Sequence, residues 1–352
     1  MKLFRSARFS VFLPCMFALA IFAVPQAVRA QQTWQASVGA ESKDMGRQAL
    51  AFLPNEIWIH VGDSITWTFQ SDEIHTLTFL TPGQGYPPFQ GPGAGCPGFS
   101  SSGAAFNGSS CVTSPPLVKG QAFTVMFSKA GTYKFECLVH PSMFGVIHVL
   151  NVTQPLPHGQ DFYNDQAAAQ RKALLTDTDQ KMEMDGEHDS DDAFSVSVIS
   201  HKKHVIAGRG EISSTPGGNQ TMSIVRFLKG TIEIHVGDTV EWANYDPDEP
   251  HTITFGAEPP PPTFPFPSAN VTVDPDGTPH ATITSPSDNV HSGFIAAILE
   301  DEPKPGPPGP GYPTNPISPT RFRVTFTQPG TYPYRCVLHD NLGMVGKVVV
   351  LP

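Results

Sequence analysis

The stretch FTVMFSKAGTYKFECLVH, residues 123–140, recurs as FRVTFTQPGTYPYRCVLH at residues 322–339. Both stretches alternate apolar and polar residues, turn at Gly-Thr, and end with a cysteine followed three residues later by a histidine. Alternation with a period of two is typical of β-strands. The chain therefore carries the same strand–turn–strand unit twice, and each copy leads into a Cys-x2-His loop.

Two earlier motifs recur in the same order. IWIHVGDSITW at 57–67 returns as IEIHVGDTVEW at 232–242, and HTLTF at 75–79 returns as HTITF at 251–255. Val-Gly-Asp marks a turn between two strands. Ordered repeats of this length indicate a duplicated domain. The short alternating runs predict an all-β fold with two Greek-key β-sandwiches in tandem.

The ends and the middle of the chain set the expected domain organisation. The first 30 residues combine a basic start, an apolar stretch and small residues before Ala30, which predicts a cleaved secretory signal peptide and a periplasmic or secreted protein. The expected parts are a signal peptide at 1–30, a first sandwich at 31–153, a linker at 154–192 and a second sandwich at 193–352.

The linker and one long insertion in each half depart from the strand pattern. In the acidic linker, Asp161 and an alanine run predict a short helix to about Leu175, followed by a solvated tail. The first insertion, at 80–116, is rich in Gly, Ser and Pro. In the proline-rich second insertion, at 256–319, Asp274-Pro275-Asp276-Gly277 separates two alternating runs and predicts an extra hairpin.

Composition excludes several classes of partner. The chain has 352 residues and a formal net charge of −10, which argues against binding to nucleic acid. The apolar stretch of the signal peptide is too short to span a bilayer, and we expect no membrane span elsewhere. The sequence makes no prediction about the oligomeric state.

The cysteines fall into two groups. Cys96 and Cys111 lie close together in the first insertion, where export favours a disulfide. Cys137 and Cys336 occupy matching positions in the two repeats. An even number of cysteines after cleavage is also compatible with two disulfides, but the repeated context indicates another role for this pair.

Each cysteine loop also carries a methionine. The spacing is Cys-x2-His-x2-Met from Cys137 and Cys-x2-His-x4-Met from Cys336, and each half has an upstream histidine, His75 or His251, at the start of a strand. Two histidines and one cysteine in a plane, with a weak methionine above, are the ligands of a blue copper site. Single buried residues of these types are usually core packing, but four types recurring in order in two copies favour a metal site.

These motifs resemble the cupredoxin family of type 1 blue copper proteins. The Val-Gly-Asp turn, the early His-Thr strand and the Gly-Thr-Tyr strand before the cysteine all fit its pattern, over roughly 33–153 and 193–352. The first copper loop resembles that of amicyanins and the second that of plastocyanins. The resemblance implies two coppers per chain, with the ligands His75, Cys137, His140 and Met143 in one site and His251, Cys336, His339 and Met344 in the other. Met126 and Met222 remain as alternative methionines.

The same resemblance implies outer-sphere transfer of one electron at each copper. His140 and His339 would be partly exposed ligands, and apolar neighbours such as Pro141, Phe144 and Leu342 would form patches where a redox partner protein docks. The loops differ in length, so we expect unequal reduction potentials. Whether the two coppers exchange electrons is left open.

Two other classes of function compete with an electron carrier. Multicopper oxidases and copper nitrite reductases need a further, open copper centre, and a histidine typically precedes the copper cysteine; here Glu136 and Arg335 stand there, so such an enzyme would need a site at an interface. A periplasmic copper storage or resistance protein would use looser Met/His sites, for which Met182, Met184 and His188 are the candidates.

Overall fold

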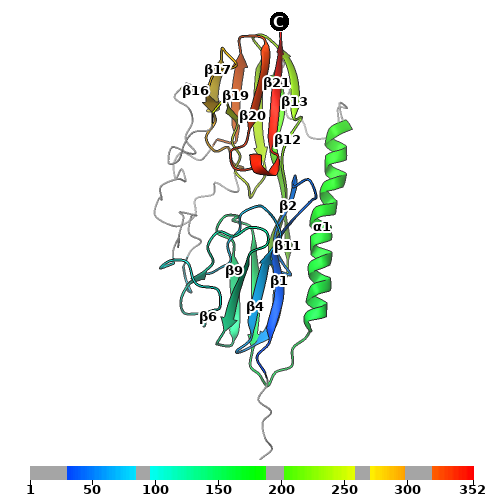
Figure 1. Cartoon of the computed structure of the whole chain (residues 1–352), viewed down its shortest axis with the longest axis vertical. Helices are drawn as coiled ribbons and strands as arrows, with labels where there is room; N and C mark the ends of the chain where they lie inside the picture. Colours follow the sequence, from blue (N-terminus) through cyan, green and yellow to red (C-terminus); the bar gives the residue numbers. More distant parts are fainter. Residues whose placement is uncertain (1–29, 85–95, 188–201, 258–269, 298–318) are drawn as a thin grey trace, which may run out of the picture. The chain divides into compact units, whose positions relative to one another are not determined.

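The computed structural model describes residues 30–84, 96–187, 202–257, 270–297 and 319–352 (Figure 1). Residues Gln31–Pro352 form one compact unit. The predicted signal peptide, up to residue 29, lies outside the described residues, as do the proline runs at 259–262 and 304–316. No described helix combines the length and the apolar character needed to cross a bilayer.

The described residues form mostly β-structure, with one α-helix between two β regions. The strands of the first half are β1 (Thr33–Glu41), β2 (Arg47–Leu53), β3 (Glu56–His60), β4 (Ser64–Phe69), β5 (Thr78–Phe79), β6 (Ala104–Phe106), β7 (Val112–Thr113), β8 (Ala122–Phe127), β9 (Gly131–Glu136) and β10 (Phe144–Leu150).

The second half repeats this order after α1 (Gln160–Glu187). Its elements are β11 (Lys202–Thr215), β12 (Gly218–Leu228), β13 (Thr231–His235), β14 (Thr239–Tyr245), β15 (Thr254–Phe255), β16 (Val271–Val273), β17 (Pro279–Ile283), β18 (Val290–His291), β19 (Arg321–Phe326), β20 (Gly330–Arg335), the 3-10 turn η1 (Asp340–Leu342) and β21 (Val345–Leu351).

Each half is a sandwich, as predicted, but the two halves share a sheet. One 11-stranded sheet runs β16-β17-β19-β14-β11-β12-β2-β1-β4-β8-β6 through both halves, and each half adds a five-stranded sheet, β3-β10-β9-β5-β7 or β13-β21-β20-β15-β18. Each core draws buried side chains from both of its sheets and includes a fully buried tryptophan, Trp67 in the first half and Trp242 in the second. The duplicated motifs therefore produce duplicated cores.

Strands β2 and β12 make the junction between the halves. They pair antiparallel over four residues each, from Leu50 opposite Thr221 to Arg47 opposite Ile224. Six of the seven β2 residues are buried, because β2 is covered by the core on one face and by α1 on the other. Its sequence, RQALAFL, is an almost continuous apolar run rather than an alternating one, which is typical of a strand buried on both faces.

Helix α1 is longer than predicted and packs along the sheet. It extends to Glu187 instead of ending near Leu175, and it runs beside β1, β2 and β12 (Figure 1). Leu174 is buried against β2 and β12 with Met222 and Ile224. The helix predicted from Asp161 to about Leu175 is therefore confirmed, and a few apolar positions such as Leu174 hold it on the junction. The predicted solvated tail stays a prediction.

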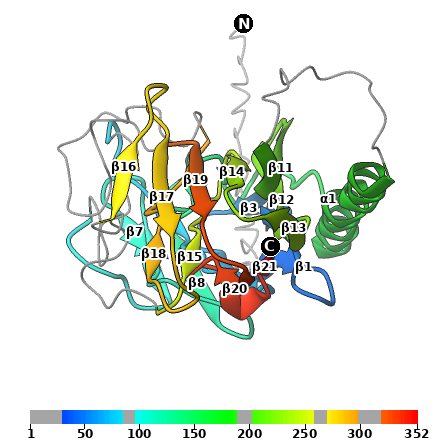
Figure 2. The same cartoon turned by 90° about the horizontal axis from the view of Figure 1, so that it is seen from above.

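Both insertions add a strand that pairs in parallel with the sheet at matching places. Strand β6 pairs with β8 in the first half, and β17 pairs with β19 in the second. The predicted hairpin is confirmed as β16–β17, which lies beside β19 (Figure 2). The predicted disulfide between Cys96 and Cys111 is also present, and it closes part of the first insertion.

Candidate metal centres

The first cluster gathers three of its predicted ligands at one end of the first sandwich. His75 precedes β5 and is fixed by backbone hydrogen bonds with Leu117; Cys137 follows β9; His140 lies in the loop before β10. His75 Nδ1 lies 3.0 Å from His140 Nδ1, and Cys137 Sγ lies 3.5 Å from His140 Nδ1. All three side chains are fully buried.

The second cluster repeats this arrangement with similar spacings. His251 Nδ1 lies 3.1 Å from His339 Nδ1, and Cys336 Sγ lies 3.5 Å from His339 Nδ1 and 3.8 Å from His251 Nδ1. Three donors held about 2 Å from a central ion stand between 3 and 4 Å apart. A soft sulfur with two imidazoles is the donor set that suits copper in both oxidation states. Both triangles therefore fit a type 1 copper ion.

The surroundings of each cysteine favour the thiolate that binds a metal. Although burial alone would raise the pKa of the Cys137 thiol, the adjacent His140 lowers it below its usual value. In the second cluster, His339 and His251 hold the pKa of Cys336 well below its usual value against the same burial. Backbone N–H groups add support, from Thr76 to Cys137 Sγ at 3.4 Å and from Thr252 to Cys336 Sγ at 3.3 Å. Such hydrogen bonds to a ligand tune a metal site.

The two loop methionines are buried at the ends of their loops. The Met143 carbonyl accepts the Cys137 N–H at 3.0 Å, and the Met344 carbonyl accepts the Cys336 N–H at 3.1 Å. Of the alternative methionines, Met222 packs in the junction cluster and Met126 lies in β8, opposite Ser64. The axial role of Met143 and Met344 stays a prediction.

The expectation of exposed ligand histidines was wrong. His140 is fully buried and His339 is 2% exposed, because both lie at the junction of the halves. Leu342, expected in a docking patch, is also buried, and Phe144 is half-buried with its carbonyl against Gly218. The resemblance described single domains, in which this end is free, whereas here each half covers the end of the other.

Two carboxylates from opposite halves meet the outer nitrogens of these histidines. His140 Nε2 lies 3.0 Å from Glu249 Oε1 and 3.8 Å from Glu73 Oε1, and His339 Nε2 lies 3.4 Å from Glu249 Oε2 and 3.5 Å from Glu73 Oε2. Sequence reasoning missed this group. The repeated Glu-x-His spacing, Glu73 before His75 and Glu249 before His251, was available as a clue.

Electrostatics at this group follow from its burial. Although burial alone would lower the pKa of His140, Glu249 and the Cys137 sulfur raise it well above its usual value. Conversely, His140 and His339 hold the pKa of Glu249 well below its usual value despite complete burial. Ionised carboxylates can stay buried only when they are paired in this way.

Other junction residues hold the two copper loops differently. Asp248 Oδ1 accepts the Ser142 N–H from the first loop at 2.8 Å, while Asp248 Oδ2 accepts the Thr221 hydroxyl. The second loop is held from its own half, by Arg226 Nη1 donating to the Leu342 carbonyl at 2.8 Å. Arg226 also donates to the Asp44 carbonyl in the first half. Each loop is thus tied to the junction by a charged side chain.

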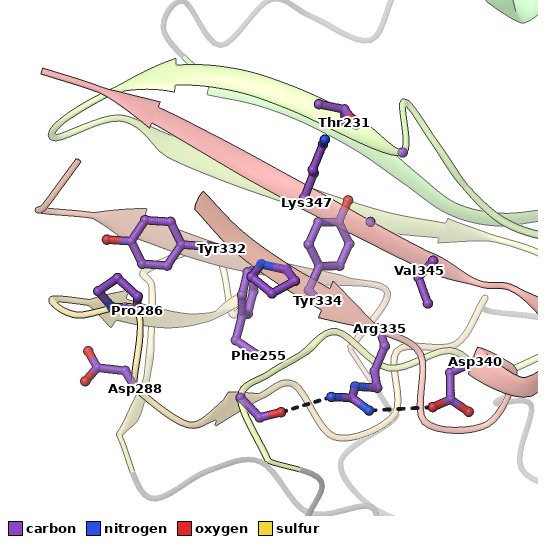
Figure 3. Close-up of a pocket in the computed structure, with 14 residues that line it drawn as sticks. Thr231, Phe255, Pro286, Asp288, Tyr332, Tyr334, Arg335, Asp340, Val345 and Lys347 are labelled. Carbon is purple, nitrogen blue, oxygen red and sulfur yellow. Dashed lines mark hydrogen bonds and ion pairs between the residues drawn. The ribbon is translucent and has the colours of Figure 1, made fainter. Parts of the chain in front are cut away.

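A separate surface pocket lies beside the second cluster. It has a volume of about 860 Å³, and Tyr332, Tyr334 and Phe255 are among its lining residues (Figure 3). Arg335 crosses its edge between the Gly256 carbonyl, at 3.4 Å, and Asp340, at 3.8 Å. None of the candidate ligands lines this pocket, so it is distinct from the metal centre.

Comparison with known proteins finds one family in both halves of the chain. A family model described as copper binding proteins, plastocyanin/azurin family, matches residues 39–153 and 214–351. Amicyanin from Paracoccus denitrificans is 27% identical over 94 residues, which are 27% of this chain and 54% of amicyanin. The chain thus spans about half the length of this curated relative.

Solved amicyanin structures match about a third of the chain. An oxidised methionine-to-leucine mutant of amicyanin matches with 20% identity and a TM-score of 0.22, over 33% of this chain and 81% of amicyanin. A reduced Cu(I) proline-to-glycine mutant at pH 4 matches with 22% identity and a TM-score of 0.23, over 35% and 88%. The family model covers both halves and more than half of the residues, and the chain therefore belongs to the plastocyanin/azurin family of copper-binding proteins.

Proposed function

We propose that this chain is an exported electron carrier that moves one electron at a time through two type 1 copper sites. The observation that carries the proposal is the buried His-Cys-His triangle, which occurs twice with nearly the same spacing. Family membership supports it, since cupredoxins are typically electron carriers. The basic and apolar N-terminal stretch supports export to the periplasm or beyond.

We assign eight ligands, four to each site. They are His75, Cys137, His140 and Met143 in the first half, and His251, Cys336, His339 and Met344 in the second. Copper supplies the one-electron redox step when it is bound. The protein's part is to bind it by a thiolate and two imidazoles, to exclude water by burial, and to hold these groups so that little rearrangement accompanies a change of oxidation state.

A second candidate function, an enzyme with a further metal at an interface, is favoured by one observation. Glu73, His140 and Glu249 bring three potential ligand atoms within 4.8 Å of one another. Against it, Glu136 and Arg335 stand immediately before the two cysteines, where a copper oxidase typically has a histidine.

Electron paramagnetic resonance separates the two functions. The spectrum of the purified protein is integrated against total copper before and after oxidation. Two type 1 signals that account for all the copper are the result expected for an electron carrier. A type 2 signal, or copper that stays silent after oxidation, would show a catalytic centre and contradict the carrier.

A further inference from the structure

The carboxylates of Glu73 and Glu249 stand between the two copper sites and contact a ligand of each. From this we infer that they act as a bridge through which the two sites exchange electrons inside one chain. The inference rests on the proposed function and deepens it. It makes Glu73 and Glu249 positioning residues that act through His140 and His339.

Each half contributes one carboxylate and one ligand histidine to the bridge. Each carboxylate lies within 4 Å of both outer nitrogens, the shortest contact being His140 Nε2 to Glu249 Oε1 at 3.0 Å. When Nδ1 of an imidazole faces the metal, its Nε2–H is the donor that remains. A carboxylate has two acceptor oxygens and can receive one such N–H from each side. Glu249 presents a different oxygen to each histidine.

Charge balance explains why two acids are buried at this place. Cu(II) bound by one thiolate carries one net positive charge, so two oxidised sites match the two carboxylates. Reducing one site would leave part of this negative charge unbalanced. Because the group is buried, the electrostatic interaction of this charge with the other copper would be strong. The oxidation state of one site should therefore alter the potential of the other.

The junction keeps this path short and dry. Glu249 is 2% exposed and Glu73 is 7% exposed, so water is largely excluded. The β2–β12 pairing and the hydrogen bond from Ser142 N–H to Asp248 hold the halves together. Electron tunnelling weakens with distance and with gaps between bonded groups. An imidazole–carboxylate–imidazole contact is therefore a favourable route between the sites.

Pulse radiolysis of the copper-loaded full-length protein tests the bridge. One electron is delivered per molecule, and its redistribution is followed by absorption or by EPR of freeze-quenched samples. Cys137→Ser and Cys336→Ser variants provide the spectrum of each site alone. We expect a first-order exchange phase whose rate does not depend on protein concentration. Glu249→Gln should slow it by about tenfold, because it removes the negative charge and one of the two oxygens that face His140 and His339.

Two further variants guard against a merely structural effect. Glu73→Gln removes the partner carboxylate from the other half and should also slow the exchange. Glu241→Gln is the matched control: its carboxylate is equally buried, but it is paired with Arg323 away from the junction. It should leave the exchange rate unchanged. Copper content and blue absorption check that each variant still holds both coppers.

Several results would overturn the bridge. These are exchange that occurs only between molecules, an unchanged rate in both Glu249→Gln and Glu73→Gln, or a third metal ion per chain that is lost in Glu249→Gln. In the last case the carboxylates would be metal ligands. Failure of the proposed function would look different, because neither site would then accept an electron at all.

Discussion

The two halves build the same His-Cys-His triangle with different supports. In the first half, the loop from Cys137 to Met143 is held across the junction by Asp248; in the second, the longer loop contains the turn Asp340–Leu342 and is held by Arg226 from its own half. The two insertions are also held differently. A disulfide closes part of the first insertion, whereas ion pairs from Arg323 hold the hairpin turn of the second. The same three candidate ligands can therefore be positioned by different neighbouring residues.

The largest expected effect separates the two sites outright. Cys137→Ala removes the thiolate of the first site and should abolish its blue absorption while leaving that of Cys336. Cys336→Ala should do the reverse. Absorption spectra and copper content of the two variants check this. Loss of both sites in either variant would mean that they bind copper as one unit.

In the second half, Arg323 should contribute strongly to stability where the β16–β17 hairpin joins the sheet. Its guanidinium is 3% exposed and pairs with buried Glu241 and with Asp274 and Asp276 of the hairpin turn. Arg323→Leu leaves Glu241 buried without this partner and should lower the free energy of unfolding by about 3–5 kcal/mol. Denaturant titration measures the change. Arg321→Leu, at a side chain that is 42% exposed, is the control and should cost no more than about 1 kcal/mol.

In the first half, the disulfide between Cys96 and Cys111 should stabilise the insertion, as Arg323 does in the second half. Cys96 and Cys111 are 15 residues apart, and a loop of that size contributes about 3 kcal/mol by restricting the unfolded chain. The double variant Cys96→Ala, Cys111→Ala should lose about this amount in thermal or denaturant unfolding. The blue absorption of the first site should persist, since its ligands lie elsewhere. Its loss would show that the insertion supports the metal site.

A smaller effect should distinguish the two loop supports. Asp248→Ala leaves the Ser142 N–H and the Thr221 hydroxyl without their acceptor, which should cost about 1–3 kcal/mol. It should shift the spectrum of the first site and leave that of the second. Arg226→Met, which removes the donor to Leu342, should shift the second site instead. Equal shifts at both sites in either variant would contradict separate supports.

The smallest expected effect is a change in pH dependence. Burial raises the pKa of Asp246 well above its ordinary value of 3.8. A raised pKa means that its contribution to stability is fully present below about 3.8 and is lost as pH rises through the folded-state pKa. Asp246→Asn should remove this loss, so its stability relative to the wild type should grow from pH 4 to pH 8. Unfolding at several pH values checks this, with Asp161→Asn on the exposed start of α1 as control.

Sequence patterns predicted the strands and the two Cys-x2-His loops because both depend on local spacing, whereas the upstream His75 and His251 were assigned from the order of the repeated motifs and from the family resemblance. Alternation within 123–140 and 322–339 sets which residues enter the cores, and a Cys-x2-His loop can place sulfur and nitrogen together wherever it follows a strand. The disulfide and the β16–β17 hairpin were also predictable, since both link residues close in sequence. The start of helix α1 was predicted, but its extension past Leu175 was not, because the acidic sequence there has no periodic apolar pattern that indicates a helix.

The amino-acid sequence by itself determined the duplicated domain, the all-β fold and the grouping of two histidines with a cysteine in each half. Only the tertiary structure decided that β2 pairs with β12, that His140 and His339 are buried, and that Glu73 and Glu249 lie between them. The physical reason is distance along the chain. A strand or a ligand loop is specified by neighbours a few residues apart, whereas the junction depends on how two complete sandwiches pack, and no local pattern encodes that.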